Sequence, residues 1–158
     1  MSDLLSLEDY QSLAASLSLP AAAFVNGGFR ASAGEIMATT NPATGDVLAE
    51  IAMANEADVD YAVAKARDAF DQGQWSKRHP AERKEVLIRL CKLLTRNRHE
   101  LAVMEAIESG KTVQDCATID LPETINTIKW HAEAIDKIYD DTAPVGDGAI
   151  AMINREPI

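Results

Sequence analysis

Apolar and polar residues alternate with a period of two in the first third of the chain, and with a helical period after Asn55. Residues 35–39 and 46–54 follow the first pattern, and the segment between them is rich in the turn-forming residues Asn, Pro and Gly. Upstream, the stretch FVNGGFR places an Asn-Gly-Gly turn between short apolar segments, which is typical of a β-hairpin. The pattern therefore predicts a small β layer in this part of the chain.

Two helices are predicted next. Asn55 and Asp58 form an N-cap signature, and apolar residues then recur on one face until Gly73 ends the helix. Pro80 fits the first position of the second helix, whose apolar stripe continues to Gly110. Glycine is common just after the C-terminus of a helix, so we expect the second helix to end there.

The last predicted helix and the last predicted strand both carry apolar residues that require a partner. Asp120 and Glu123 fit the capping positions of a helix whose apolar residues form one seam between Leu121 and Tyr139. Residues 149–155 form an expected strand with apolar side chains on both faces, which is normally buried or paired. At the other end of the chain, residues 1–20 are predicted to form an amphipathic helix.

Composition narrows the class of protein. The chain has 158 residues, of which 47% are hydrophobic and 25% charged, as is usual for one globular domain with a hydrophobic core. A net charge of −10 disfavours nucleic acid and anionic membranes as partners, because both would repel the chain. No apolar run approaches the length of a membrane span. The two cysteines form no C-x-x-C pair, which fits a reduced, cytoplasmic compartment.

Several candidate catalytic motifs fail on inspection. The stretch SGKT at residues 109–112 would need a second glycine where Glu105 stands to act as a phosphate-binding loop. The glycine signature of a dinucleotide-binding fold, G-x-G-x-x-G, does not occur. Cys91 lies on an apolar helical stripe, and aspartates close to Cys116 disfavour a thiolate. The residues themselves therefore predict an α+β protein without an assembled active site.

Six stretches, in order along the chain, resemble the N-terminal part of NAD(P)-dependent aldehyde dehydrogenases. They are FVNGGF, TNPATGDVLAEI, ARDAFDQGQW, PAERKEVLIRL, EAIESGKT and the terminal NREPI. The resemblance runs from about Phe24 to the last residue. Within the family, the stretch WHAEAIDKIY is most similar to the γ-glutamyl-γ-aminobutyraldehyde dehydrogenases.

The resemblance implies that the chain is an α+β fragment of an α/β enzyme. Its order of elements would be a β-hairpin and short strands, then four to five helices, then a strand of the oligomerisation type. Residues 21–139 would form the N-terminal part of a Rossmann-like cofactor-binding domain, and residues 140–158 the start of the oligomerisation segment. The catalytic domain would be absent, since the oxyanion-hole Asn, the general-base Glu and the catalytic Cys of such enzymes lie further along their chains.

The resemblance also implies an activity. In the intact enzyme, a Cys thiolate attacks an aldehyde, NAD or NADP accepts a hydride from the thiohemiacetal, and water releases the carboxylic acid. The substrate would be an aldehyde, including an aminoaldehyde, and the enzyme a homo-oligomer. The 158-residue chain alone is expected to be inactive and to bind no cofactor. An alternative is a non-catalytic helical module that binds a partner protein through its last helix and terminal strand.

Three residues match minor sites of the family. The carbonyl of Thr40 and the carboxylate of Glu108 match positions that hold a structural monovalent cation in some members of the family. The alternative is that no ion binds, and that this segment is only a helix cap with a carboxylate on the surface. Glu123 matches the substrate entrance, where a carboxylate would attract the cation of an aminoaldehyde. A capping box with Asp120 explains Glu123 equally well.

Overall fold

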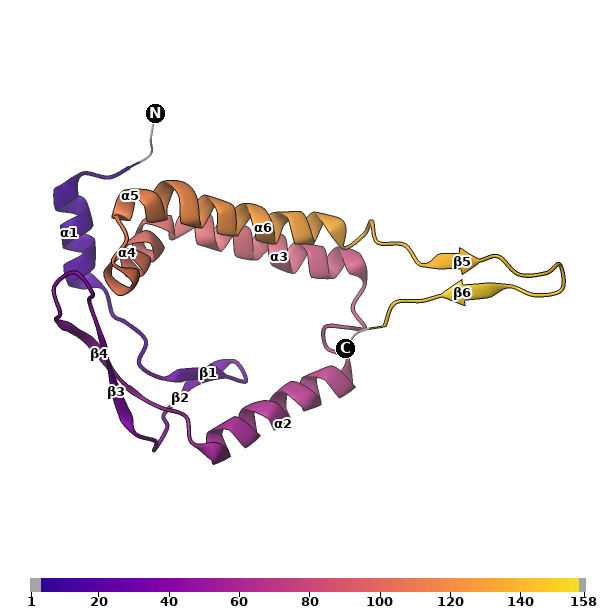
Figure 1. The fold of residues 1–158 in the computed structure, drawn as a ribbon, viewed down its shortest axis with the longest axis horizontal. Helices are drawn as coiled ribbons and strands as arrows, with labels where there is room; N and C mark the ends of the chain where they lie inside the picture. Colours follow the sequence, from indigo (N-terminus) through magenta and orange to yellow (C-terminus); the bar gives the residue numbers. More distant parts are fainter. Residues whose placement is uncertain (1–3, 157–158) are drawn as a thin grey trace.

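The computed structural model describes residues 4–156. Two long helices form one side of the structure (Figure 1). Helices α3 (Pro80–Arg96) and α6 (Leu121–Ala134) lie side by side and run in opposite directions. Helices α4 (Arg98–Ser109) and α5 (Val113–Asp115) and the π-helix η1 (Cys116–Asp120) connect them at one end. Helix α1 (Leu7–Ser16) packs against α4, and residues 1–3 of the predicted first helix lie outside the described part.

The predicted β layer is confirmed as two separate antiparallel hairpins. Strand β1 (Ala23–Val25) pairs with β2 (Gly28–Arg30), and β3 (Ile36–Thr40) pairs with β4 (Val47–Ala52). Asn26 and Gly27 have φ angles of 52° and 82°, the left-handed conformation that a two-residue hairpin turn requires. The turn residues of the sequence therefore set the connection of the first hairpin.

Helix α2 (Glu56–Gln72) has the predicted termini. The side chain of Asn55 accepts a hydrogen bond from the backbone N–H of Asp58, the carboxylate of Asp58 accepts one from the N–H of Asn55, and Gly73 ends the helix at φ 70°. Asp58 also accepts a hydrogen bond from the Ser32 hydroxyl at 2.5 Å, which ties the helix to the segment after the first hairpin. No residue of α2 is buried, so most of its surface has no partner among residues 4–156.

The predicted uninterrupted helix from Pro80 to Gly110 is wrong at Asn97. Here α3 ends and α4 begins, with Asn97 at φ −101° and ψ 18°. The side-chain amide of Asn97 donates a hydrogen bond to the carbonyl of Leu93 at 3.0 Å, the same carbonyl that its backbone N–H contacts. Asparagine side chains compete for backbone groups in this way, which favours a helix end over a helix interior.

The predicted capping box at the start of α6 is also wrong. Asp120 has helical backbone angles and makes no side-chain capping hydrogen bond, because the helix continues from η1. In η1 the N–H of Leu121 reaches back to the carbonyl of Cys116, the wider spacing of a π-turn. Pro122 follows directly and has no N–H to donate, so the regular helical pattern is interrupted at this point. At its other end, α6 stops at Ala134 rather than continuing to Tyr139.

The terminal strand is shorter than predicted and has a partner within the chain. Strand β6 (Ala151–Ile153) pairs with β5 (Asp141–Ala143), a strand that the sequence analysis did not predict. The backbone N–H of Arg155 donates to the Asp140 carboxylate at 3.1 Å at the base of this hairpin. The hairpin projects away from the helices in Figure 1, and Ile150 and Met152 are 83% and 70% exposed.

The hydrophobic core is small and lies where α1, α3, α4, η1 and α6 meet. The buried apolar residues of the described chain are Tyr10, Cys91, Ala102, Val103, Cys116 and Ala132. Trp75 and Trp130 are 44% and 65% exposed within the described chain. Among residues 4–156, no helix is both long enough and apolar enough to cross a membrane.

Candidate cation site and substrate entrance

Pro42, in the turn after β3, lies against Gly110, the residue after α4, which brings the segments of the two predicted cation ligands together. Thr40 is the last residue of β3, and the turn after it is fixed by Asn41, whose side-chain oxygen accepts the N–H of Ala43 at 2.9 Å. This turn directs Pro42 at Gly110, where a Cβ atom would lie 2.9 Å from the Pro42 Cγ. Only glycine allows this approach.

Helix α4 ends at Ser109, one residue after Glu108. Gly110 adopts φ 76°, and its N–H donates to the carbonyl of Ala106 at 3.0 Å. The negative end of the helix dipole and the exposed Glu108 carboxylate both favour a cation here. Within the described residues, however, no three His, Cys, Asp or Glu side chains gather as a metal-binding group. A site would therefore rely on backbone carbonyls such as that of Thr40.

Glu108 and Glu123 line one pocket, a relation that the sequence analysis missed. The pocket opens between α4, η1 and α6 and has a volume of about 860 Å³. Its acidic residues are Glu105, Glu108, Asp120 and Glu123, and its walls include Leu101, Met104, Ile119 and Ile128. The spacing of Glu105 and Glu108 puts them on one side of a helix. Their position opposite Glu123 depends on how α4 and α6 pack.

One carboxylate of the pocket is already paired. The Lys111 ammonium contacts the Asp120 carboxylate at 2.8 Å, and this hydrogen bond, followed by the attraction between the charges, raises the pKa of Lys111. Among the described residues, no hydrogen bond or ion pair is present for the carboxylates of Glu105, Glu108 or Glu123. The pocket therefore keeps negative charge that faces solvent.

Both cysteines are poorly placed to act as nucleophiles. Cys116 is fully buried beside the pocket, and this burial, followed by the charges of Asp120 and Glu105, raises the pKa of its thiol. Cys91 is buried on α3, where its sulfur lies 3.7 Å from the carbonyl oxygen of Ile125. The expectation that neither cysteine is activated agrees with this burial.

Comparison with known proteins decides the family. The model of the aldehyde dehydrogenase family matches residues 29–158. The chain belongs to the aldehyde dehydrogenase family. It is 57% identical to the aminoacetaldehyde dehydrogenase of Pseudomonas aeruginosa, over 100% of this chain and 32% of that protein. The resemblance found in the sequence is thus confirmed.

Solved structures of the aldehyde dehydrogenase family have the same arrangement of elements. The indole-3-acetaldehyde dehydrogenase AldA of P. syringae, solved with NAD+ and IAA, superimposes with a TM-score of 0.93 at 37% identity, over 98% of this chain and 31% of AldA. The γ-glutamyl-γ-aminobutyraldehyde dehydrogenase of Burkholderia cenocepacia gives 0.86 at 40% identity, over 90% of this chain and 29% of that one. The chain therefore spans about a third of the length of these relatives.

Proposed function

We propose that this chain forms part of an enzyme that oxidises aldehydes, including aminoaldehydes, to carboxylic acids with NAD or NADP. The observation that carries this proposal is the 57% identity to an aminoacetaldehyde dehydrogenase, which extends over the whole chain. Such an enzyme would form a thiohemiacetal on a cysteine and release the acid by hydrolysis. No particular observation favours the alternative of a non-catalytic interaction module.

We assign the nucleophile, the general base and the cofactor-binding residues of the proposed enzyme to a part of the enzyme that is not among these 158 residues. Cys91 and Cys116 are both buried, so neither offers an exposed thiolate to an aldehyde. The cofactor likewise has no candidate residues here, because the chain lacks a glycine-rich loop and its acidic pocket would repel a pyrophosphate. The role proposed for this chain is to form part of the substrate entrance and to give that entrance negative charge.

Glu123 is proposed to stand at the substrate entrance. It lines the acidic pocket together with Glu105 and Glu108, and an ammonium group approaching this pocket would be attracted by all three. The other role predicted for Glu123 was a capping box with Asp120. Asp120 makes no side-chain capping hydrogen bond and instead contacts Lys111. A carboxylate at Glu123 therefore favours aminoaldehydes over neutral aldehydes.

A monovalent cation is proposed to bind between the Thr40 carbonyl and the Glu108 carboxylate. The contact of Pro42 with Gly110 supports this proposal, because it holds the end of β3 beside the last turn of α4. Hard oxygen ligands suit such an ion, and the helix terminus adds further negative potential.

Residues 21–139 are proposed to belong to the cofactor-binding domain, and residues 140–158 to an oligomerisation segment. The exposed apolar side chains of the β5–β6 hairpin support the second assignment, since Ile150 and Met152 need a covering surface. The partner proposed for this hairpin is another subunit of the same enzyme.

The test is a chimera in which this chain replaces the matched third of the P. aeruginosa aminoacetaldehyde dehydrogenase. We expect the chimera to reduce NAD with aminoacetaldehyde. In the chimera, Glu123→Gln should raise KM for aminoacetaldehyde about fivefold, equivalent to about 1 kcal/mol, and leave KM for propionaldehyde nearly unchanged. The matched control is Glu85→Gln on α3, outside the pocket.

Two results would count against the proposal. An inactive chimera that is folded and assembled would contradict the assignment of the chain to this activity. Equal changes in KM for both aldehydes, or the same change with Glu85→Gln, would remove Glu123 from the substrate entrance and leave the activity in place. High salt should reduce the effect of Glu123→Gln, because it screens charges that face solvent.

A further inference from the structure

A lysine of this chain places its own ammonium group in the acidic pocket. Among the described residues that line this pocket, Lys111 alone carries a positive charge. Its Nζ atom donates a hydrogen bond to Oδ2 of Asp120 at 2.8 Å. A lysine side chain ends in a primary ammonium, which is also the charged group of a primary aminoaldehyde. The contact therefore shows that Asp120 can bind a primary ammonium within the pocket.

The Lys111 ammonium is held at one carboxylate, but its side chain is not locked in place. The backbone is positioned by Gly110, which ends α4 at φ 76°, and the N–H of Lys111 donates to the Ser109 hydroxyl oxygen at 3.3 Å. The side chains of Lys111 and Asp120 are 51% and 31% exposed, so water reaches the contact. A flexible lysine in such a contact can leave the carboxylate and return to it.

The electrostatics keep the ammonium charged. The hydrogen bond to Asp120, followed by the attraction between the two charges, raises the pKa of Lys111, and the charge of Glu105 acts in the same direction. At neutral pH the pocket therefore contains a permanent cation next to Asp120. The carboxylates of Glu105, Glu108 and Glu123 stay unpaired among the described residues.

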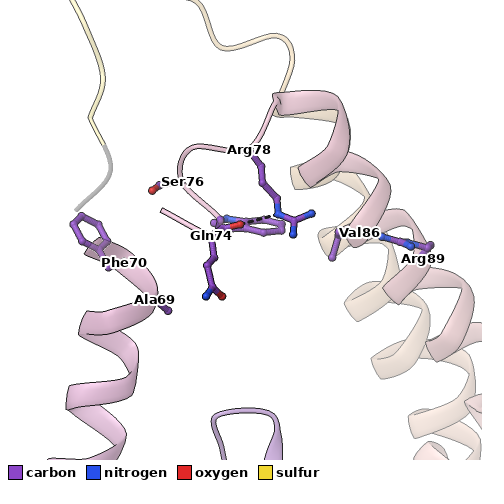
Figure 2. A pocket seen from close by; sticks show the side chains of 8 residues that line it. Ala69, Phe70, Gln74, Ser76, Arg78, Val86 and Arg89 are labelled. Atoms are coloured by element: carbon purple, nitrogen blue, oxygen red, sulfur yellow. Dashed lines mark hydrogen bonds between the residues drawn. The ribbon is translucent and has the colours of Figure 1, made fainter. Parts of the chain in front are cut away.

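A second pocket, between the end of α2 and the first half of α3, has the opposite charge (Figure 2). Its described lining includes Arg78 and Arg89 but no Asp or Glu. The Nε–H of Arg78 donates to the Gln74 carbonyl at 2.7 Å, as Figure 2 shows. An ammonium group would be repelled from this pocket and attracted to the acidic one.

We propose that Lys111 competes with the ammonium group of an aminoaldehyde for Asp120. This inference rests on the proposed function, in which the acidic pocket is the substrate entrance. While Lys111 contacts Asp120, the other three carboxylates attract the substrate but this one is not available for direct contact. Lys111 thus limits the preference for aminoaldehydes over neutral aldehydes. It is a positioning residue, because it acts through Asp120 and not on the reacting atoms.

The test uses the chimera with the P. aeruginosa aminoacetaldehyde dehydrogenase. Lys111→Met should lower KM for aminoacetaldehyde about threefold, and change neither kcat nor KM for propionaldehyde appreciably. The matched control is Lys129→Met, which removes the same charge on α6. Lys129 pairs with Glu133 at 3.8 Å, and neither residue lines the acidic pocket. This control should leave both KM values as they are.

The Asp120→Asn background separates competition at Asp120 from general repulsion by a lysine. In about 0.5 M NaCl, exposed charges more than about 4 Å apart are largely screened from one another. Lys111→Met should still lower KM for aminoacetaldehyde under this condition, and should have no effect once Asp120 is Asn. Ethylammonium should inhibit the Lys111→Met chimera competitively, at least about threefold more strongly than the unmodified chimera.

Four results would overturn the inference. They are an unchanged KM for aminoacetaldehyde in Lys111→Met, an equal change for propionaldehyde, an equal effect of Lys129→Met, and an effect that persists with Asn at position 120. If any of them occurs in an active chimera in which Glu123→Gln acts selectively on aminoacetaldehyde, the proposed function stands and only the competition is wrong. A folded but inactive chimera would contradict both.

Discussion

The ring of Pro42 occupies the space where a side chain on Gly110 would begin. A Cβ atom at Gly110 would lie 2.9 Å from the Pro42 Cγ, and Gly110 also has a φ of 76°. Gly110→Ala should therefore lower the free energy of unfolding by about 1–3 kcal/mol, through strain and steric conflict. Urea unfolding of the chain measures this change. Gly45→Ala is the matched control, because Gly45 has a φ of 78° and a Cβ there meets nothing within 4 Å; an equal effect of both variants would contradict the close packing.

The proposed cation site predicts a specific response to potassium. Potassium should raise the melting temperature of the aminoacetaldehyde dehydrogenase chimera above its value in an equal concentration of choline, because a ligand of the folded state stabilises it. Glu108→Gln should remove most of this difference, since it deletes a charged oxygen ligand. The control is Glu100→Gln at the other end of α4. If Glu108→Gln keeps the full potassium effect, the cation does not bind there.

A cluster of charges between α3 and the end of α6 predicts a dependence of stability on pH. Hydrogen bonds from Lys137 and then Lys84 lower the pKa of Asp136 from 3.8 to about 2. A lowered carboxyl pKa stabilises the folded state above pH 4, and this contribution is lost as the pH falls from about 4 to about 2. Lys84→Met should flatten the loss of stability in this window.

The Lys84→Met prediction is checked by urea unfolding at several pH values between 2 and 5, near the ordinary and lowered pKa of Asp136. Lys84 on α3 contacts Asp136, in the turn after α6, at 2.9 Å, whereas Lys92 on the same helix as Lys84 has no ion pair among the described residues. Lys92→Met should therefore leave the pH dependence as it is. Identical profiles for the two variants would show that the Lys84–Asp136 contact contributes nothing to the pH dependence.

The β5–β6 hairpin predicts self-association. Its backbone is paired within the chain, so the tendency to associate arises from exposed side chains such as Ile150 and Met152 and from its two open edges. The double substitution Ile150→Lys and Met152→Lys should shift the chain from dimers or larger species toward monomer, as measured by sedimentation velocity. If the unmodified chain is already a monomer at tens of micromolar, the hairpin is not an association surface by itself.

The sequence correctly predicted those helices and turns whose bounds are set by residues close together in the chain. The capping box of Asn55 and Asp58 and the stop at Gly73 set the bounds of α2, and the Asn-Gly turn set the first hairpin. Strand β5 was missed because residues 141–143 are short and partly polar and take their conformation from pairing with β6. The break at Asn97 was missed because asparagine fits the polar side of a continuous helix.

The acidic pocket could not be predicted for a related reason. Glu108 and Glu123 were assigned separate roles, and they line one pocket only because α4 and α6 meet through η1. That meeting depends on contacts distant in sequence and on the π-turn ahead of Pro122, which no periodic pattern indicates. The resemblance to the family pointed to Glu108 and Glu123 separately, but it did not show that they line the same pocket.

We propose that this chain contributes to aldehyde oxidation without containing the reacting groups. The most direct measurement is NADH formation by the purified 158-residue chain with aminoacetaldehyde and NAD, followed by its absorbance. Because Cys91 and Cys116 are buried and the acidic pocket would repel the cofactor, we expect no rate above the uncatalysed background. Aldehyde-dependent NADH formation by the chain alone, abolished by Cys91→Ala or Cys116→Ala, would contradict the account.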